Sequence, residues 1–301
     1  MSKKKKLIVI TGPTAVGKTA VAIEIAKHFQ TEIISADSRQ FYAELNIGVA
    51  RPSTDELAAV MHHFIGFLPL EEVYSAGRFE KDALALLDDL FIHHDVVVCA
   101  GGSGLFVDAL LNGLDDLPSD ESIREHWSAI FSKDGIEPLQ KKIAELDPIY
   151  YDQMDQQNPH RLVRAIEVCL ASGEAYSSLR KKSKIERPFD SLLVGLTSER
   201  EWLYNRINKR VDAMIELGLV EEARAVFSKR SLNALNTVGY KEIFDHFDGV
   251  CSIEKSIELI KQHTRQFAKR QWTWWNKKEH IHWLHVDQPH DVLRFVLEKL
   301  D

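Results

Sequence analysis

The stretch that decides the fold reads Gly12-Pro13-Thr14-Ala15-Val16-Gly17-Lys18-Thr19. It matches the phosphate-loop pattern G-x-x-x-x-G-K-[ST] at every fixed position. A short apolar run at 7–10 precedes it and predicts a buried parallel strand. The residues at 20–28 follow it and predict a helix that is apolar on most faces. Strand, glycine loop and helix are the context that this motif requires, so we predict an α/β fold that binds a di- or triphosphate at the loop.

The loop residues have distinct chemical tasks. Gly12 and Gly17 let the backbone turn tightly enough to aim several amide groups inward, and the following helix adds its positive end. Lys18 is a point charge for the outer phosphate, and the Thr19 hydroxyl can ligate Mg²⁺. A chance glycine turn is the structural alternative, and the correct flanks disfavour it. The motif alone leaves open which phosphate compound binds and whether a group is transferred.

Composition narrows the class of protein. The chain has 301 residues, of which 45% are hydrophobic, and a formal net charge of -7, so a nucleic-acid partner must use local patches. The three cysteines lack metal-ligand spacing, which indicates a reducing compartment. The lysines of Met1–Lys6 read as a solvated tail, and the apolar run after them is too short for a signal peptide. No run is long enough to span a membrane, and we expect a cytoplasmic protein.

Further buried strands are predicted at 32–35, 95–100, 191–196 and 281–286. Ligands sit at the carboxyl ends of parallel strands, so we expect Asp37 and Gln40 to face the phosphate loop. Asp37 can be a general base or an indirect metal ligand, and an Asx-turn or helix cap is an equally good interpretation. The paired His62 and His63 lack matching metal ligands nearby, which favours packing or capping.

A second glycine loop, Gly101–Phe106, leaves the strand at 95–100 and enters a helix. Its amides and the Ser103 hydroxyl can hold an anion or a nucleotide, and a plain strand-to-helix turn is the alternative. From about residue 114 the chain becomes helical and polar. We therefore divide it into a phosphate-loop core at 1–115, a helical insertion at 116–188 and the rest of the core at 189–301.

Two basic regions suggest RNA. Arg161 and Arg164 lie three residues apart, after a predicted Asn158–Pro159 helix start, and the run Arg180–Arg187 is basic. Near the C-terminus, Lys261–Lys278 carries six cations, no carboxylate and three interleaved tryptophans, which suits stacking on RNA. A solvated surface or a tryptophan core is the structural alternative for each region.

These blocks together resemble the tRNA dimethylallyltransferases (tRNA isopentenyltransferases), in that family's order and over nearly the whole chain. Ser103 stands where the family usually has Thr and keeps the hydroxyl, and Phe106 replaces a common Tyr. The blocks that carry the resemblance are Gly12–Thr19, Asp37–Tyr42, Gly101–Leu105, Arg161–Glu167, Gly239–Glu242 and Thr264–Trp274.

The resemblance implies a reaction, in which the dimethylallyl group of dimethylallyl diphosphate moves to N6 of adenosine 37 in tRNA and diphosphate leaves with Mg²⁺. It also implies a kinase-like parallel sheet with an inserted helical domain that grips the anticodon stem-loop, in a protein that we expect to be a monomer. The catalytic residues it implies are Asp37, Lys18, Thr19, Ser103 and Arg210, with Thr19 on the metal and Gly12–Thr19 on the diphosphate. Its tRNA-binding residues are Asp37, Ser38, Arg39, Gln40, Ser103, Arg124, Arg161, Leu162, Val163, Arg164, Ala165, Arg265, Lys269 and Arg270.

Three other functions use some of the same features. A small-molecule kinase would place ATP in the loop, but no separate apolar strand ends in an aspartate that would compete with Asp37 for Mg²⁺. A non-catalytic RNA-binding protein would keep the loop without using Asp37. Prenyl transfer to free adenine nucleotides is closest to the favoured reaction, and the helical insertion with the basic helix favours RNA over a small acceptor.

Overall fold

The computed structural model describes residues 4–180, 185–286 and 289–300. Contacts divide the chain into one unit of Met1–Asn112 with Glu186–Asp301 and a second unit of Gly113–Ile185. The sequence had placed these junctions slightly later, at 115/116 and 188/189. Residues 181–184 of the predicted basic run Arg180–Arg187 lie outside the described residues. Within the described ranges no helix is long and apolar enough to cross a membrane.

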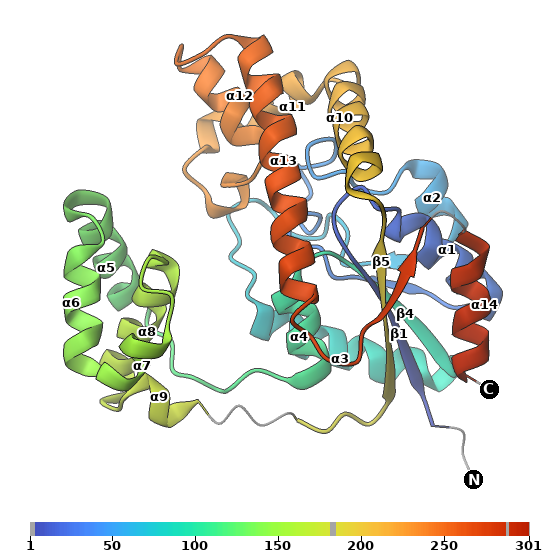
Figure 1. Cartoon of the computed structure of the whole chain (residues 1–301), viewed down its shortest axis with the longest axis horizontal. Coiled ribbons are helices and arrows are strands. Elements are labelled where there is room, and N and C mark those ends of the chain that lie inside the picture. Colours follow the sequence, from blue (N-terminus) through green and yellow to red (C-terminus); the bar gives the residue numbers. More distant parts are fainter. Residues whose placement is uncertain (1–3, 181–184, 287–288, 301) are drawn as a thin grey trace. The chain divides into compact units, whose positions relative to one another are not determined.

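The first unit is built on a six-stranded sheet in which every pair of neighbouring strands is parallel (Figure 1). The strand order is β3-β2-β4-β1-β5-β6, so the strand that feeds the phosphate loop lies in the middle. The predicted parallel α/β class is confirmed, and the short edge strand β3 is the one strand that the sequence analysis missed. The strands are β1 Lys6–Thr11, β2 Ile33–Ser35, β3 His62–His63, β4 Val96–Ala100, β5 Asp190–Thr197 and β6 His282–His285.

Helices cover both faces of this sheet because its central strands are apolar on both faces. Alternate residues of β1 point to opposite sides: Leu7 packs in one buried cluster with Phe79, whereas Ile8 packs in another with Val21. The helices of this unit are α1 Lys18–Phe29, α2 Thr54–Ala59, α3 Ala76–His93, α4 Gly104–Asn112, α10 Arg200–Glu216, α11 Leu219–Val226, α12 Tyr240–Phe247, α13 Ile253–Trp275 and α14 Pro289–Leu300, with short 3₁₀ turns η1 Phe227–Lys229 and η2 Asn233–Leu235.

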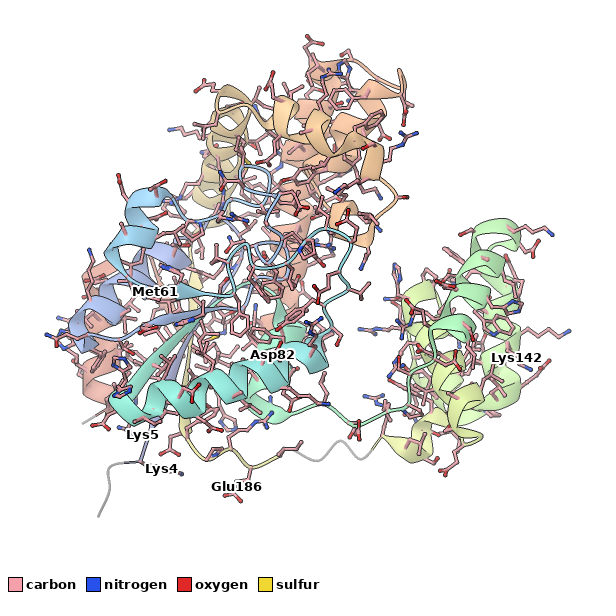
Figure 2. The ribbon with its side chains drawn as sticks, turned by 180° about the vertical axis from the view of Figure 1, so that it is seen from behind. Lys4, Lys5, Met61, Asp82, Lys142 and Glu186 are labelled. Atoms are coloured by element: carbon pink, nitrogen blue, oxygen red, sulfur yellow. The ribbon has the colours of Figure 1, made fainter. Side chains whose placement is uncertain are left out.

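The lysines at the start of β1 make specific contacts. The expectation of a solvated tail was wrong for Lys5 and Lys6, which are half-buried, whereas Lys4 is exposed. Lys4 and Lys5, labelled in Figure 2, pair with Asp190 at 2.6 Å and Asp95 at 2.9 Å. The Lys6 ammonium donates to the carbonyl of Leu300 at 2.6 Å. These contacts join the amino end of β1 to its neighbours because the carboxylates and the carbonyl lie at the same edge of the unit.

The paired histidines have structural roles, as the sequence suggested. His63 contacts the carboxylate of Glu32 through Nε2 at 2.5 Å, and His62 contacts the carbonyl of Val60 through Nδ1 at 2.8 Å. Both contacts lie at the edge of the sheet, where β3 is the last strand.

A half-buried carboxylate organises the long loop after β2. The Glu222 carboxylate of α11 accepts hydrogen bonds from the amides of Asn46, Ile47 and Gly48 and from the hydroxyl of Tyr240, at 2.6 to 3.1 Å. A side chain at Gly48 would lie 2.6 Å from the Tyr240 ring. The carboxylate of one glutamate therefore satisfies backbone amides that have no partner in regular secondary structure.

The second unit is entirely helical in its described part, which confirms the predicted helical insertion. It has its own buried core, formed by Leu139, Ile143, Leu162, Val163, Ala165, Ile166 and Cys169. α8 begins as the sequence predicted, with the Asn158 side chain accepting from the Arg161 amide and Pro159 in the first turn. Its helices are α5 Glu121–Asp134, α6 Glu137–Leu146, α7 Pro148–Gln153, α8 Pro159–Ser172 and α9 Tyr176–Leu179.

A fully buried carboxylate, Glu167, holds the insertion together. It accepts hydrogen bonds from Arg124 and from the Asp120 amide and pairs with Arg164, at 2.7 to 3.1 Å. Burial alone would raise the pKa of Glu167, but the hydrogen bonds from Arg124, Asp120 and Arg164 outweigh it and lower that pKa to about 2. Arg164 also donates to the carbonyls of Leu117 and Pro118, so this network fixes the chain where the insertion begins.

We predict that Glu167→Gln destabilises the insertion by about 3 kcal/mol at pH 7, because two arginines then lose their shared buried counter-charge. The folded pKa lies below the ordinary value, so the stabilisation is complete above about pH 4.5 and is lost as the pH falls towards 2. Hydrogen–deuterium exchange of α8 peptides measures this loss of stability. Glu145→Gln, an exposed glutamate paired with Lys142 at 3.6 Å, is the control; equal protection of α8 in both variants would contradict the role of Glu167.

Candidate active site

The phosphate loop leaves β1 in a conformation that only glycine allows at two points. Gly12 has φ 136° and Gly17 has φ 110°. A Cβ atom on Gly12 would lie 2.5 Å from the backbone oxygen of Leu196 on β5. The loop therefore passes directly against the neighbouring strand, and Val16, buried in the core, anchors its far side.

Lys18 lies folded over this loop. Its ammonium donates to the carbonyls of Gly12 at 3.1 Å and Pro13 at 2.9 Å. Burial lowers the pKa of Lys18 to about 8, with the nearby Arg210 lowering it further and Asp37 opposing the change. A lysine in this state gains from any anion placed beside it, because the anion compensates the cost of its burial.

Asp37 follows β2 in a tight turn. Its Oδ1 accepts the Arg39 amide at 3.1 Å, and its carbonyl accepts the Gln40 amide at 3.0 Å. This is the Asx-turn that the sequence left as an alternative, yet the side chain also borders both cavities described below. The turn thus holds the carboxylate in place without removing it from the site.

The second glycine loop is tied to the Asp37 turn. A Cβ atom on Gly101 would lie 2.2 Å from the backbone oxygen of Ala36, so the two backbones touch. The Ser103 hydroxyl accepts the Ser38 amide at 3.0 Å and lies 3.2 Å from the Ser38 hydroxyl. Ser103 therefore fixes the orientation of the turn that carries Asp37.

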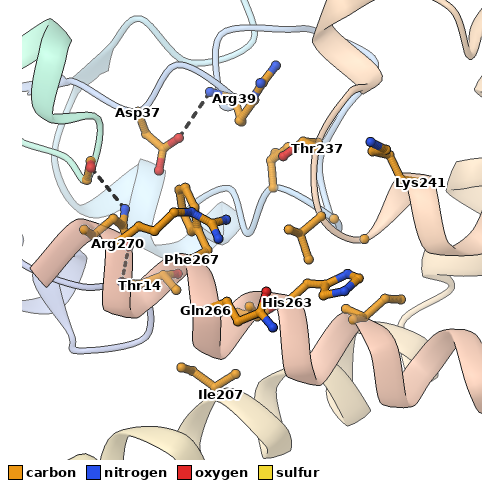
Figure 3. A pocket seen from close by; sticks show the side chains of 18 of the residues that line it. Thr14, Asp37, Arg39, Ile207, Thr237, Lys241, His263, Gln266, Phe267 and Arg270 are labelled. Atoms are coloured by element: carbon orange, nitrogen blue, oxygen red, sulfur yellow. Dashed lines mark hydrogen bonds between the residues drawn. The ribbon is translucent and has the colours of Figure 1, made fainter. Parts of the chain in front are cut away.

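Two cavities meet at this point. The smaller, of about 400 Å³, is bordered by Gly17, Lys18, Thr19, Gln40 and Arg206 among others. The larger, of about 760 Å³, extends along α13 and the chain at 236–242. Figure 3 shows Asp37 and Arg39 on one side of the larger cavity and Phe267, Gln266 and His263 on α13 opposite them.

The two cavities share four bordering residues, Thr14, Asp37, Val49 and Arg210. Burial lowers the pKa of Arg210, and Asp37 opposes this change. Arg206, one turn earlier on α10, lies over the Trp202 ring at 4.7 Å and borders the smaller cavity alone. A carboxylate and a guanidinium thus lie on the wall common to the smaller cavity, beside the glycine loop at 12–19, and the larger one.

Several residues of the predicted RNA-binding set in the core are engaged within the protein. The Arg39 guanidinium donates to the carbonyls of Asn233 and Ala234 at 3.0 and 3.2 Å. The Gln40 amide donates to the carbonyl of Ala50 at 2.9 Å, and Arg265 donates to Asn208 at 2.6 Å. On α13, Lys269 and Arg270 are exposed, and Arg270 borders the larger cavity.

The predicted set in the insertion divides by exposure. Arg161 is exposed, and the guanidinium groups of Arg124 and Arg164 are partly exposed despite their bonds to Glu167. The side chains of Leu162, Val163 and Ala165 are buried in the core of the insertion.

Two contributors to the site were missed by sequence reasoning. Gln271 of α13 is buried against both glycine loops, and Glu242 holds the amide of Gly239 at 2.8 Å and contacts His263 at 2.6 Å. The blocks that resemble the family contain Gln271 and Glu242, but no spacing rule links Gln271 to Thr14, which lies 257 residues away.

The residues present suit a metal that takes few protein ligands. No group of three or more His, Cys, Asp or Glu side chains within 4–180, 185–286 and 289–300 is placed to hold an ion by itself. Thr19 offers one hydroxyl beside the smaller cavity. Mg²⁺ bound through one or two protein oxygens, phosphate oxygens and water fits this donor set.

We predict that the affinity for inorganic diphosphate falls about tenfold between pH 7 and pH 9, because Lys18 with a pKa near 8 loses most of its charge over that range. Calorimetric titration of wild type and Lys18→Met measures it. The ionisation of the ligand is common to both proteins, so the difference between them isolates Lys18. Parallel pH curves would remove Lys18 from the anion site.

Known proteins are similar to this chain over most of its length. A family model described as IPP transferase matches residues 40–278. The tRNA dimethylallyltransferase of Christiangramia forsetii is 52% identical over 283 residues, covering 94% of each chain. The tRNA dimethylallyltransferase 1 of Bacteroides thetaiotaomicron is 46% identical over 291 residues, covering 96% of this chain and 94% of the relative.

Solved structures extend the likeness to the fold. The full-length tRNA isopentenylpyrophosphate transferase of Bacillus halodurans is 32% identical with a TM-score of 0.73, covering 99% of this chain and 97% of that one. A eukaryotic dimethylallyltransferase that acts on tRNA is 25% identical with a TM-score of 0.81, covering 98% and 77%. The chain therefore belongs to the IPP transferases, the family of the tRNA dimethylallyltransferases.

Proposed function

We propose that this protein transfers the dimethylallyl group of dimethylallyl diphosphate to N6 of adenosine 37 in tRNA and releases diphosphate. The observation that carries the proposal is the wall shared by the two cavities. It brings Asp37 and Arg210 between a phosphate loop and a space large enough for a purine. The leaving group then lies on one side of this wall and the acceptor on the other.

On the leaving-group side, the protein stabilises negative charge. The amides of Gly12–Thr19 surround the diphosphate, Lys18 turns from the loop carbonyls to its outer oxygens, and Arg210 contacts it from α10. Charge develops on the diphosphate as the bond to carbon breaks. These fixed donors favour the transition state because they need little rearrangement. A bound Mg²⁺, held by Thr19 and the diphosphate oxygens, would neutralise part of the same charge.

On the acceptor side, Asp37 acts as a general base. The exocyclic amine of adenine is a weak nucleophile because its lone pair is delocalised into the ring. Asp37 accepts the proton that N6 loses as the new carbon–nitrogen bond forms, a role worth about 10²–10⁴ in rate. Ser103 and Ser38 keep the Asp37 turn in position. The base reaches the larger cavity by leaving the anticodon-loop stack, as in other base-modifying enzymes.

The RNA is held by exposed cations from both units. Arg124, Arg161 and Arg164 of the insertion contact the backbone of the anticodon stem-loop, and Lys269 and Arg270 hold the RNA beside the core cavity. The buried Leu162, Val163 and Ala165 support α8 from inside. Arg39 and Gln40 act through the loops they bind, and Arg265 acts through Asn208 of α10. Local patches of this kind bind RNA although the net charge is -7. Since tRNA is the substrate, we place the reaction in the cytoplasm, with one chain forming the complete site.

The assay supplies labelled dimethylallyl diphosphate, Mg²⁺ and unmodified tRNA and follows label into the RNA. Label in AMP alone would indicate transfer to free nucleotides. ATP turnover with a small acceptor would indicate a kinase, and tRNA binding without transfer would indicate a non-catalytic protein. Each of these outcomes overturns the proposal.

For Asp37→Asn we expect at least a hundredfold lower turnover with nearly unchanged tRNA affinity, because the amide keeps the shape of the turn but accepts no proton. Single-turnover rates and filter-binding affinities measure the two effects. Asp89→Asn, an exposed position on α3, is the matched control. Turnover at the wild-type rate would remove Asp37 from the base role.

For Arg161→Ala we expect weaker tRNA binding at every salt concentration and a salt dependence lower by about one unit of slope, because one phosphate contact is lost. Affinities measured between low and moderate salt test this. Lys141→Ala changes an exposed cation on α6 of the same unit and serves as the control. A slope unchanged from wild type would place Arg161 off the RNA.

A further inference from the structure

One amide side chain joins the two glycine loops to α13. Gln271 is 7% exposed. Its Oε1 accepts the amide of Thr14 in the phosphate loop at 2.8 Å, and its Nε2 donates to the carbonyl of Gly102 at 3.0 Å. Both polar ends of the side chain are therefore used, each by the backbone of a different loop.

The packing leaves no freedom around this contact. A Cβ atom on Gly102 would lie 2.2 Å from Nε2 of Gln271. One helical turn further along α13, Trp274 lies against Gly104, where a Cβ atom would come within 2.2 Å of the indole nitrogen. α13 thus rests on the second glycine loop at two successive turns, and a side chain at Gly102 or Gly104 would displace Gln271 or Trp274.

The same helix forms a wall of the larger cavity. Phe267 and Arg270 border it from α13, and Gln271 borders it as well. Lys18 lies on the other side of the contact, with its ammonium 3.6 Å from the Cβ position of Gly102. Gln271 therefore stands where the acceptor cavity, the phosphate loop and Lys18 come together.

We infer that Gln271 is a positioning residue for the diphosphate, a role that rests on the proposed function of the phosphate loop. It uses one loop amide, that of Thr14, and so sets the direction of the amides that remain for the anion. It keeps the second glycine loop, and with it Ser103 and the Asp37 turn, at a constant distance from the first. A glutamine suits this task because it supplies an acceptor and a donor without placing a negative charge beside the diphosphate.

The test compares Gln271→Met with Gln271→Glu. The methionine fills the same space but makes neither hydrogen bond. The glutamate keeps the acceptor for Thr14 but loses the donor and adds a charge. Gln262→Met, at an exposed position of the same helix that borders neither cavity, is the matched control. Inorganic diphosphate affinity, KM for dimethylallyl diphosphate, kcat, tRNA affinity and melting temperature are measured for each.

For Gln271→Met we expect about tenfold weaker diphosphate binding, a raised KM for dimethylallyl diphosphate and lower kcat, with tRNA affinity within about twofold of wild type. Gln271→Glu should lose more diphosphate affinity and activity than Gln271→Met. Its activity relative to wild type should recover as the pH falls, because a protonated carboxyl group again offers a donor and carries no charge. If Gln271 only stabilised the fold, Gln271→Glu would lose less activity than Gln271→Met, because the glutamate keeps the hydrogen bond from the Thr14 amide.

Three results would overturn the inference: wild-type diphosphate affinity in Gln271→Met, a smaller loss in Gln271→Glu than in Gln271→Met, or a loss of tRNA affinity in proportion to lost stability. If Gln271→Met does not fold, the pH recovery of Gln271→Glu decides the question. Failure of the proposed function is a separate outcome, because it appears as wild-type protein that transfers no dimethylallyl group, whereas the diphosphate titrations still test Gln271.

Discussion

The close approach of backbones at the carboxyl end of the sheet is the constraint on which the site depends. Gly12 lies against the Leu196 carbonyl, and Gly101 lies against the Ala36 carbonyl, at distances that exclude any side chain. Because these loops touch their neighbours directly, their amides and carbonyls take fixed directions. Lys18 is held on two of those carbonyls, and the Asp37 turn is held by Ser103. Substituting either glycine would separate the groups that the chemistry needs together.

The carboxylate of Asp37 and the guanidinium of Arg210 lie on the wall between the two cavities, and their attraction lowers the cost of burying the charge of Arg210. Burial favours the neutral forms of Lys18 and Arg210, while Asp37 opposes that effect for both. On one side, a polyanionic substrate would offset the remaining cost of burying Lys18 and Arg210. On the other side, a nucleobase that loses a proton would transfer it to the Asp37 carboxylate. The arrangement would keep the leaving group and the acceptor in different cavities, with both close to the same charged side chains.

Both units use carboxylates, buried at Glu167 and Glu242 and half-buried at Glu222, to organise chain that lacks regular structure. Glu222 collects three loop amides, Glu242 holds the amide of Gly239, and Glu167 binds two arginines and the start of the insertion. Each satisfies several backbone or side-chain donors at once, which offsets the cost of burying its charge. In the insertion Glu167 also holds Arg124 and Arg164 with part of each guanidinium accessible.

The fold class and the phosphate loop could be predicted from the amino-acid sequence, because both depend on local patterns: apolar runs of strand length, helix periodicity, and glycines beside a lysine and a threonine. The sequence also located the helical insertion and the start of α8, where Asn158 and Pro159 act on their own turn. Only the folded chain shows that Lys5 and Lys6 bind the core, that Arg39 and Gln40 donate hydrogen bonds to backbone carbonyls of this unit, and that Gln271 spans both glycine loops. These outcomes depend on contacts between residues distant in the chain, and no local pattern carries information about which backbone atoms the folded sheet brings within hydrogen-bonding distance.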